Sequence, residues 1–235
     1  MKFSSVLYRF GSLTLSGWLV LSTAALAFKP SNVEGRPNYR RSGGTRDPVP
    51  SCLAHPETGQ VLTALVPAQT SRTASAYPDM QWFMPENNAS YLEFKLYQVT
   101  AEDGLAPLYQ MAHALSGEGG IATLSLPPQV GLPPLAVGET YFWSIDVYCD
   151  VGSDEVDMGV SGYIERVALT AQIQADLAAA GTPLERAAIA AENGLWHDAA
   201  SYLMTDRTED PAVQQAWESL LEAVDLSELT TVPLL

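Results

Sequence analysis

The stretch that decides the fold is YFWSIDVYC, residues 141–149. Its even-numbered positions are polar or carry a hydroxyl group, with Phe142 as the apolar exception. A period of two places successive side chains on opposite faces of a strand. The stretch therefore predicts a strand with one face in a core. The large residues of that face are Tyr141, Trp143, Ile145, Val147 and Cys149.

The same period recurs from about residue 60 to residue 167, and turn-forming residues separate the repeats. About seven short strands result, which predict an α+β protein whose first part is an antiparallel β-sandwich over residues 52–167. Besides residues 141–149, the strand candidates are Val61–Val66, Met80–Met84, Leu92–Leu96, Leu108–Leu115, Ala122–Leu126 and Met158–Ile164. One local pattern adds detail, because Leu135-x-x-Gly138-x-x-Tyr141-x-Trp143 resembles the tyrosine corner of fibronectin type III and related immunoglobulin-like sandwiches.

Helical periodicity replaces strand periodicity after Val167 and predicts about four helices over residues 168–235. Thr182-Pro183-Leu184-Glu185 forms a capping box, and Asp210-Pro211 starts the last helix. The two middle helices resemble one tetratricopeptide hairpin. We expect this helical segment to pack on the sandwich through Trp196 and the apolar stripe of the last helix, which is Val213, Ala216, Trp217, Leu220, Leu221 and Val224.

Residues 1–27 have the features of a signal peptide. Lys2 and Arg9 precede an apolar stretch, and Ala25-Leu26-Ala27 has the form that signal peptidase cleaves. The apolar stretch is shorter than the roughly 20 residues that span a membrane. We therefore expect export to the periplasm or beyond, Phe28 as the first mature residue, and no transmembrane segment after cleavage.

The chain is acidic, with 12 Lys and Arg against 27 Asp and Glu and a net charge of −15. Such a balance argues against nucleic acid as a partner, because phosphate binding needs clustered cations. Residues 28–51 differ, being rich in Pro, Gly, Ser and Arg, and they predict a basic flexible arm. Either the arm is a disordered leader, or it docks on the acidic body or on an anionic polymer.

Both cysteines, Cys52 and Cys149, lie in the predicted mature chain. Exported proteins fold in an oxidising compartment, and the chain has no Cys-x-x-Cys motif, so we expect a structural disulfide. The bridge would close a loop of about 100 residues, which the chain-entropy model values at about 4–5 kcal/mol.

Several motifs in order resemble the domain-of-unknown-function family numbered 928, which is known from exported proteins of cyanobacteria. The resemblance covers most of the mature chain and implies the architecture and export, and it implies no activity. Its motifs are Arg41–Arg46 with Cys52, Leu62-Thr63-Ala64-Leu65-x-Pro67, Tyr77-Pro78-x-x-x-Trp82-Phe83-x-Pro85, Glu93-Phe94-x-Leu96, Tyr141–Cys149, Gly162–Val167, Glu185-Arg186-Ala187 and Gly194–Ala199.

The chain carries no catalytic motif that we can identify. It has three histidines and neither a Gly-x-Ser-x-Gly elbow nor zinc spacing, so we expect no cofactor, and we interpret His197 as a packed or surface helix residue. Asp150, Asp154 and Asp157 share one loop and form a weak calcium candidate, although turn-favouring acids explain them equally well.

The sequence favours a non-enzymatic envelope module that binds a protein or a glycan. The alternative is a hydrolase acting on envelope polysaccharide through two carboxylates that converge in a cleft. Tyr91, Tyr97, Phe142 and Tyr148 lie out of step with the apolar sets of their strands. Such rings can stack on sugars, but we expect the helical segment to cover them.

Overall fold

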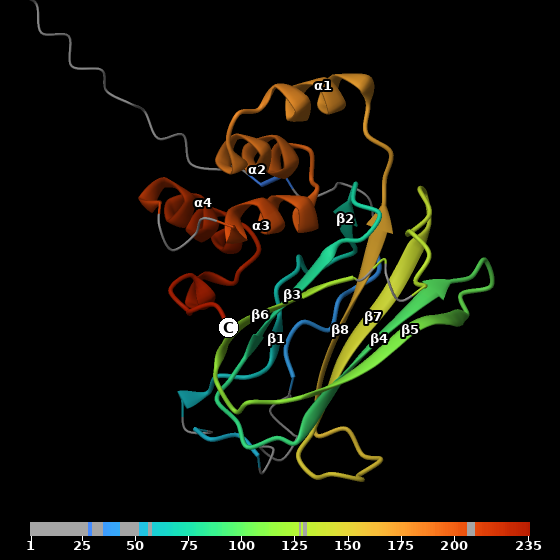
Figure 1. Ribbon diagram of the computed structural model, residues 1–235, viewed down its shortest axis with the longest axis vertical. Helices are drawn as coiled ribbons and strands as arrows, with labels where there is room; N and C mark the ends of the chain where they lie inside the picture. The colour runs from blue at the N-terminus through green and yellow to red at the C-terminus, as the bar shows by residue number, and fades with distance from the viewer. Residues whose placement is uncertain are drawn as a thin grey trace, which may run out of the picture.

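Two sheets and four helices build the chain (Figure 1) in a computed structural model that confirms the α+β class. The structure describes residues 28–29, 35–42, 52–55, 58–126, 128, 131–205 and 210–235. The expected signal peptide, residues 1–27, lies outside the described residues.

Eight strands form a three-stranded sheet in the order β1-β3-β6 and a five-stranded sheet in the order β2-β8-β7-β4-β5. All pairings inside them are antiparallel except β2 with β8, which is parallel. The strands are β1 Thr63–Ala64, β2 Ser71–Thr73, β3 Asp79–Met84, β4 Tyr91–Val99, β5 Leu105–Ala114, β6 Gly120–Ser125, β7 Thr140–Tyr148 and β8 Met158–Arg166.

The alternation of large apolar and mainly polar residues that predicted β7 matches the alternation of buried and half-buried residues from Thr140 to Val147. Trp143 and Ile145 are fully buried, and the same is true of Phe94 and Leu96 on β4 beside it. Gly162 on β8 lies opposite Trp143, and a Cβ atom there would come within 3.1 Å of the indole ring. The large residues of β7 and β4 therefore fill the core, and a small residue on β8 makes room for the indole.

The predicted tyrosine contact is present, because the Tyr141 hydroxyl accepts a hydrogen bond from the Ala136 backbone N–H at 2.7 Å. β2 was not predicted. It has three residues, Ser71, Arg72 and Thr73, and none of them is apolar, so periodicity gives no signal.

Four helices follow the strands, and two of them begin at the caps that the sequence predicted. Thr182 makes the predicted capping box with Glu185, and the Asp210 side chain accepts from the Ala212 N–H. Both caps satisfy backbone N–H groups that the first turn of a helix leaves without partners. The helices are α1 Ala171–Ala179, α2 Pro183–Glu192, α3 Trp196–Met204 and α4 Pro211–Glu222, followed by the 3₁₀ turn η3 Ser227–Leu229.

The helical segment meets the sheets through α3, which packs on β2 and β3. Trp196 is fully buried, and its Nε1–H donates to the Leu65 carbonyl at 2.7 Å. The stripe of α4 is buried against the same core cluster. Figure 1 shows the helices gathered at one end of the sheets, with β4, β5 and β7 extending away from them. Across the described parts of the chain, no helix has the length and hydropathy to span a membrane.

Residues 35–42, which belong to the segment expected as a flexible arm, are paired with both sheets. Tyr39 forms a backbone bridge with Ser161 on β8, and Arg41 forms one with Thr63 on β1. The guanidinium of Arg41 also pairs with Glu228 in η3. This part of the segment is docked because its backbone pairs with the edge strand β1 and with the part of β8 that extends beyond the short strand β2.

Candidate functional site

The outward side chains of the five-stranded sheet form a continuous surface of aromatic and charged groups, which we call the outer face. They lie at alternate positions of neighbouring strands, and all are partly exposed except Tyr148, which is buried with 6% of its surface exposed. The outer face consists of Tyr91, Glu93, Lys95, Tyr97, Phe142, Ser144, Asp146, Tyr148, Ser161 and Tyr163.

The rings of the outer face form two groups. Tyr91 and Tyr148 stack with their centroids 4.6 Å apart and their planes 8° from parallel. Phe142 lies between Tyr97 and Tyr163, with centroids 6.1 Å and 5.1 Å away. Cross-strand register explains both groups, because residues directly opposite each other on neighbouring strands bring their side chains together.

Three charged groups separate the two ring groups. The Lys95 ammonium lies 2.9 Å from a Glu93 oxygen and 2.9 Å from an Asp146 oxygen. Burial alone lowers the pKa of Lys95, but the hydrogen bonds to Asp146 and Glu93 outweigh it and raise the pKa above its ordinary value. The hydrogen bond from Lys95 also lowers the pKa of Glu93. The centre of the outer face therefore holds one ammonium group between two carboxyl groups.

The docked segment 35–42 borders the outer face. Tyr39 lies opposite Ser161 and is 54% exposed, the largest exposed fraction of the aromatic side chains in the described residues. The Arg36 guanidinium lies over the Tyr163 ring, 5.4 Å from its centroid, and pairs with Asp103 in the loop between β4 and β5. The segment thus adds one exposed ring and one cation to the margin of the sheet.

The outer face thus combines aromatic rings with charged and hydroxyl groups. Aromatic rings stack on the apolar faces of flat ligands, and carboxylates, ammonium groups and hydroxyls bond to polar substituents. We expected the helical segment to cover these rings, and that expectation is wrong. The helices bury their apolar stripes against each other, β2 and β3 instead.

A second polar cluster joins α3 to the sheets. His197 is only 1% exposed, and its Nδ1 lies 3.0 Å from the Asp79 carbonyl, to which it must donate. Its Nε2 lies 2.7 Å from the Ser71 hydroxyl oxygen, and that hydroxyl also lies 3.0 Å from the Tyr163 carbonyl. Burial lowers the pKa of His197 to about 4, so the ring is neutral at physiological pH. His197 therefore links α3 to β2 and β3, as a packed helix residue.

Two carboxylates lie beside this histidine. Asp198 accepts from the Thr73 hydroxyl at 2.8 Å and from the Ala74 N–H at 3.0 Å, and Asp79 accepts from the Ser201 hydroxyl at 2.7 Å. Burial raises the pKa of Asp198 despite its hydrogen bonds. A cleft of about 160 Å³, here named the α3 cleft, is lined by Ser75, Tyr77, Pro78, Asp79, His197, Asp198, Ser201 and Tyr202.

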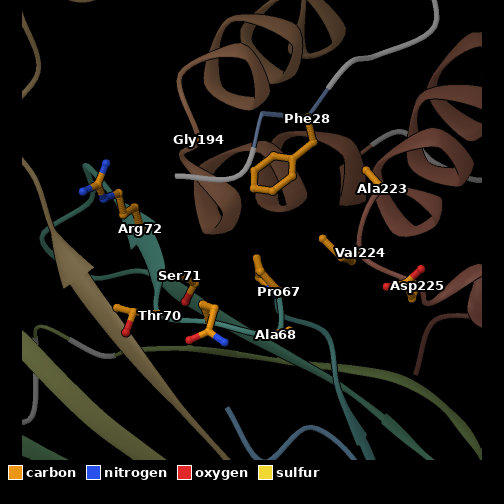
Figure 2. Close-up of a pocket in the computed structure, with 11 residues that line it drawn as sticks. Phe28, Pro67, Ala68, Thr70, Ser71, Arg72, Gly194, Ala223, Val224 and Asp225 are labelled. Carbon is orange, nitrogen blue, oxygen red and sulfur yellow. The ribbon is translucent and has the colours of Figure 1, made fainter. Parts of the chain in front are cut away.

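Another pocket, of about 190 Å³, lies between the residues that follow α4, β2 and the residues before β2. Figure 2 shows the Phe28 ring directed into it from the helical side, above Pro67 and beside Val224. Its two charged residues are Arg72 and Asp225, and Arg72 is paired with Glu165 at 3.1 Å. The walls are mainly apolar, so this pocket offers few groups for chemistry.

The predicted disulfide is confirmed, since Cys52 and Cys149 are bonded across 97 residues of sequence. The acidic loop after Cys149 holds the three residues of the calcium candidate. Asp157 accepts from the Cys149 N–H at 2.8 Å and so ties its own loop together. Within the described residues, no three His, Cys, Asp or Glu side chains gather as metal ligands, and Asp150, Asp154 and Asp157 do not form such a group.

Sequence reasoning missed Asp79 of the α3 cleft and two residues of β2 that bond to α3 beside it. Ser71, Thr73 and Asp79 lie more than 110 positions before their partners on α3 and occur in no motif. The sequence contains one hint of this cluster, which is the polar pair His197-Asp198 among the mainly apolar residues of its helix. Tyr39 was missed because it falls in a stretch without periodicity.

Comparison with family models gives one match, to a domain of unknown function, DUF928, over residues 41–234. The chain belongs to the DUF928 family. The match confirms the resemblance drawn from the sequence motifs, and it includes both the α3 cleft and the strands of the outer face in this DUF928 protein. No curated protein matches the chain.

Proposed function

We propose that this DUF928 protein is an exported, non-enzymatic envelope protein that binds a glycan on its outer face. The observation that carries the proposal is the arrangement of rings around an ionised centre on a sheet face that the helices leave uncovered. The signal-peptide features of residues 1–27 support export to the periplasm or cell surface.

A glycan fits the outer face better than a protein does. Protein interfaces are centred on apolar groups and are depleted in charge at their core. The outer face instead has Lys95, Glu93 and Asp146 in the centre and rings on both sides. Ion pairs that are already formed present fixed oxygen and nitrogen atoms, which can bond to hydroxyl groups without further ordering.

The direct test is retention of the mature chain, residues 28–235, on immobilised polysaccharide from cell envelopes. Tyr39→Ala is the first variant, because the ring is exposed and we expect its loss to leave the fold intact. A stacking contact of about 1 kcal/mol predicts about fivefold weaker binding. Tyr97→Ala tests the second ring group, and Val151→Ala, at an exposed loop residue, is the control.

Binding to a neutral glycan should persist in high salt, because stacking is not screened. Retention that disappears in high salt would instead implicate charge, through the basic segment or the acidic body. Wild-type protein that is not retained at either salt concentration, or variants that bind as tightly as the wild type, would overturn the proposal.

The second candidate is a carboxylate-dependent hydrolase acting on envelope polysaccharide at the α3 cleft. Two observations favour it: the cleft is lined by both Asp79 and Asp198, and burial raises the pKa of Asp198. In this reading Asp198 holds the proton that the leaving group needs, and Asp79 is the second carboxylate. A hydrolysis screen that includes Asp198→Asn tests it, with Asp176→Asn on exposed α1 as the control.

We also propose that the two sheets form a sandwich of the fibronectin type III or immunoglobulin-like kind. The contact of Tyr141 with the backbone five residues upstream supports this assignment. The packing of α2 against α3 supports a single hairpin of the tetratricopeptide kind. Its second helix, α3, packs on β2 and β3.

A further inference from the structure

Phe28, the residue that follows the expected signal-peptidase site, is part of the hydrophobic core. Its side chain is only 8% exposed, and its ring meets the fully buried Trp196 edge to face, with the centroids 5.0 Å apart and the planes 82° apart. Figure 2 shows the same ring directed into the pocket that Pro67 and Val224 line. Burial and the aromatic contact both stabilise this position, so Phe28 holds its part of the chain against the helices.

The backbone next to Phe28 is held at the C-terminal end of α2. The Lys29 N–H donates to the Ala191 carbonyl at 3.0 Å. Ala191 is the last residue but one of α2, and the last four carbonyls of a helix have no partner within the helix itself. Because adjacent backbone nitrogens are less than about 4 Å apart, the Phe28 nitrogen lies within about 7 Å of that carbonyl oxygen.

This end of α2 has no positive charge of its own. Its last turn holds no basic residue, and the helix ends at Glu192. Arg72, the one cation among the residues that line the pocket, is paired with Glu165. The carbonyl groups at a helix C-terminus together carry about half a negative charge, so a cation placed beside them stabilises the helix.

Removal of the signal peptide would supply such a cation. Hydrolysis of the Ala27–Phe28 peptide bond leaves the carboxylate on Ala27 and the amine on Phe28, and the amine takes up a proton. An α-amino group has an ordinary pKa of about 7.7–8.0, so it is mostly protonated at neutral pH. The Phe28 nitrogen thus changes from a neutral amide into an ammonium group while its side chain stays in the core.

We propose that the α-ammonium group of Phe28 binds at the C-terminal end of α2 in the processed protein and makes Phe28 the N-terminal anchor of the fold. Two independent observations meet at this residue, because the motif Ala25-Leu26-Ala27 ends directly before it and its own side chain is buried. Processing one residue later would remove the anchor. The proposal rests on the proposed export, since only processing creates the ammonium group, and it is independent of glycan binding.

Thermal unfolding of four chains at pH 6.5 tests the proposal. Two are the chain that starts at Phe28 and the same chain extended by Ala25-Leu26-Ala27, and the other two are their Phe28→Ala forms. Each is released from a removable fusion with a defined first residue, so the melts do not depend on export. Lys29→Ala is the matched control and should leave Tm unchanged, because its side chain is exposed and its backbone N–H remains.

Phe28→Ala should lower Tm by at least about 6 °C, because a buried ring is lost. The extension should lower Tm by about 2 °C when Phe28 is present, because it moves the charge away from α2. The extension should have little effect in the Phe28→Ala form, because the anchor is already lost. Equal Tm values for the free and extended chains with Phe28 would overturn the binding of the ammonium group, and a Phe28→Ala form as stable as the wild type would overturn the anchor.

Aminopeptidase digestion followed by intact-mass measurement reads the anchor independently of stability. The chain that starts at Phe28 should keep its first residue, whereas the Phe28→Ala form should lose residues from the same end. Rapid removal of Phe28 from the folded wild type would contradict the proposal. N-terminal sequencing of the protein that cells export from the full chain tests the export separately, and a first residue other than Phe28 would overturn the proposal for the processed protein even where the four melts agree with it.

Discussion

Acid should destabilise this protein through His197, and the size of the effect follows from the burial of the ring. In the folded chain, burial lowers the pKa of His197 from 6.5 to about 4, whereas in the unfolded chain it returns to its ordinary value. Between these two pH values the unfolded chain binds a proton that the folded chain does not. Stability therefore falls as pH drops from about 6.5 to about 4.

The magnitude comes from the same two values. At about 1.4 kcal/mol for each pH unit, the fall from 6.5 to about 4 is worth about 3 kcal/mol of unfolding free energy. Asp198 acts in the opposite direction, because its raised pKa lets the folded chain take up a proton before the unfolded chain does. It therefore offsets part of the loss toward the acid end of this range.

Urea unfolding followed by tryptophan fluorescence at several pH values between 7.5 and 4 measures the effect. The pH dependence contains contributions from many carboxylates, so the informative quantity is the difference between the wild type and His197→Gln. That difference should change by about 3 kcal/mol across the range. His113→Gln, at an exposed histidine, is the control. If the wild type and His197→Gln lose stability in parallel, the account of a buried neutral histidine is refuted.

Three further predictions concern other parts of the molecule. Replacing Cys52 and Cys149 together by Ala should lower the unfolding free energy by about 4 kcal/mol, since the bridge closes a loop of 97 residues, and an unchanged urea midpoint would contradict this. Gln81 is buried, and its side-chain amide has no hydrogen-bond partner in the described residues, so Gln81→Met should raise stability by about 1 kcal/mol in a thermal melt, and a fall would show that the amide is satisfied. Millimolar calcium and a chelator should both leave Tm unchanged, because Asp157 is engaged with the Cys149 N–H, whereas a rise of several degrees with calcium would identify a site in the loop of residues 150–157.

Much of the fold follows from local sequence signals. The alternation of β7 and β4 predicted both their strands and their buried faces, and the caps at Thr182 and Asp210 located two helix starts. β2 could not be predicted, because Ser71–Thr73 is too short and too polar for a periodic signal. Its place depends on partners distant in sequence, namely β8 and α3.

The candidate site was only partly predictable for the same reason. Tyr91, Tyr97 and Phe142 were identified because they break the alternation of their own strands. Whether they are covered depends on where the helices bury their apolar faces, which is a property of the assembled fold. The contact between Ser71 and His197 spans 126 positions, and no spacing rule in the sequence predicts a contact of that kind.

Hydroxyl-radical footprinting, with and without soluble envelope polysaccharide, tests glycan binding on the outer face most directly. The method reports the solvent access of individual aromatic side chains. The account predicts that the polysaccharide protects Tyr39, Tyr97 and Phe142 and leaves Tyr77 and Tyr202 of the α3 cleft unchanged. Protection of Tyr77 and Tyr202 with no change on the outer face would contradict it and favour the hydrolase.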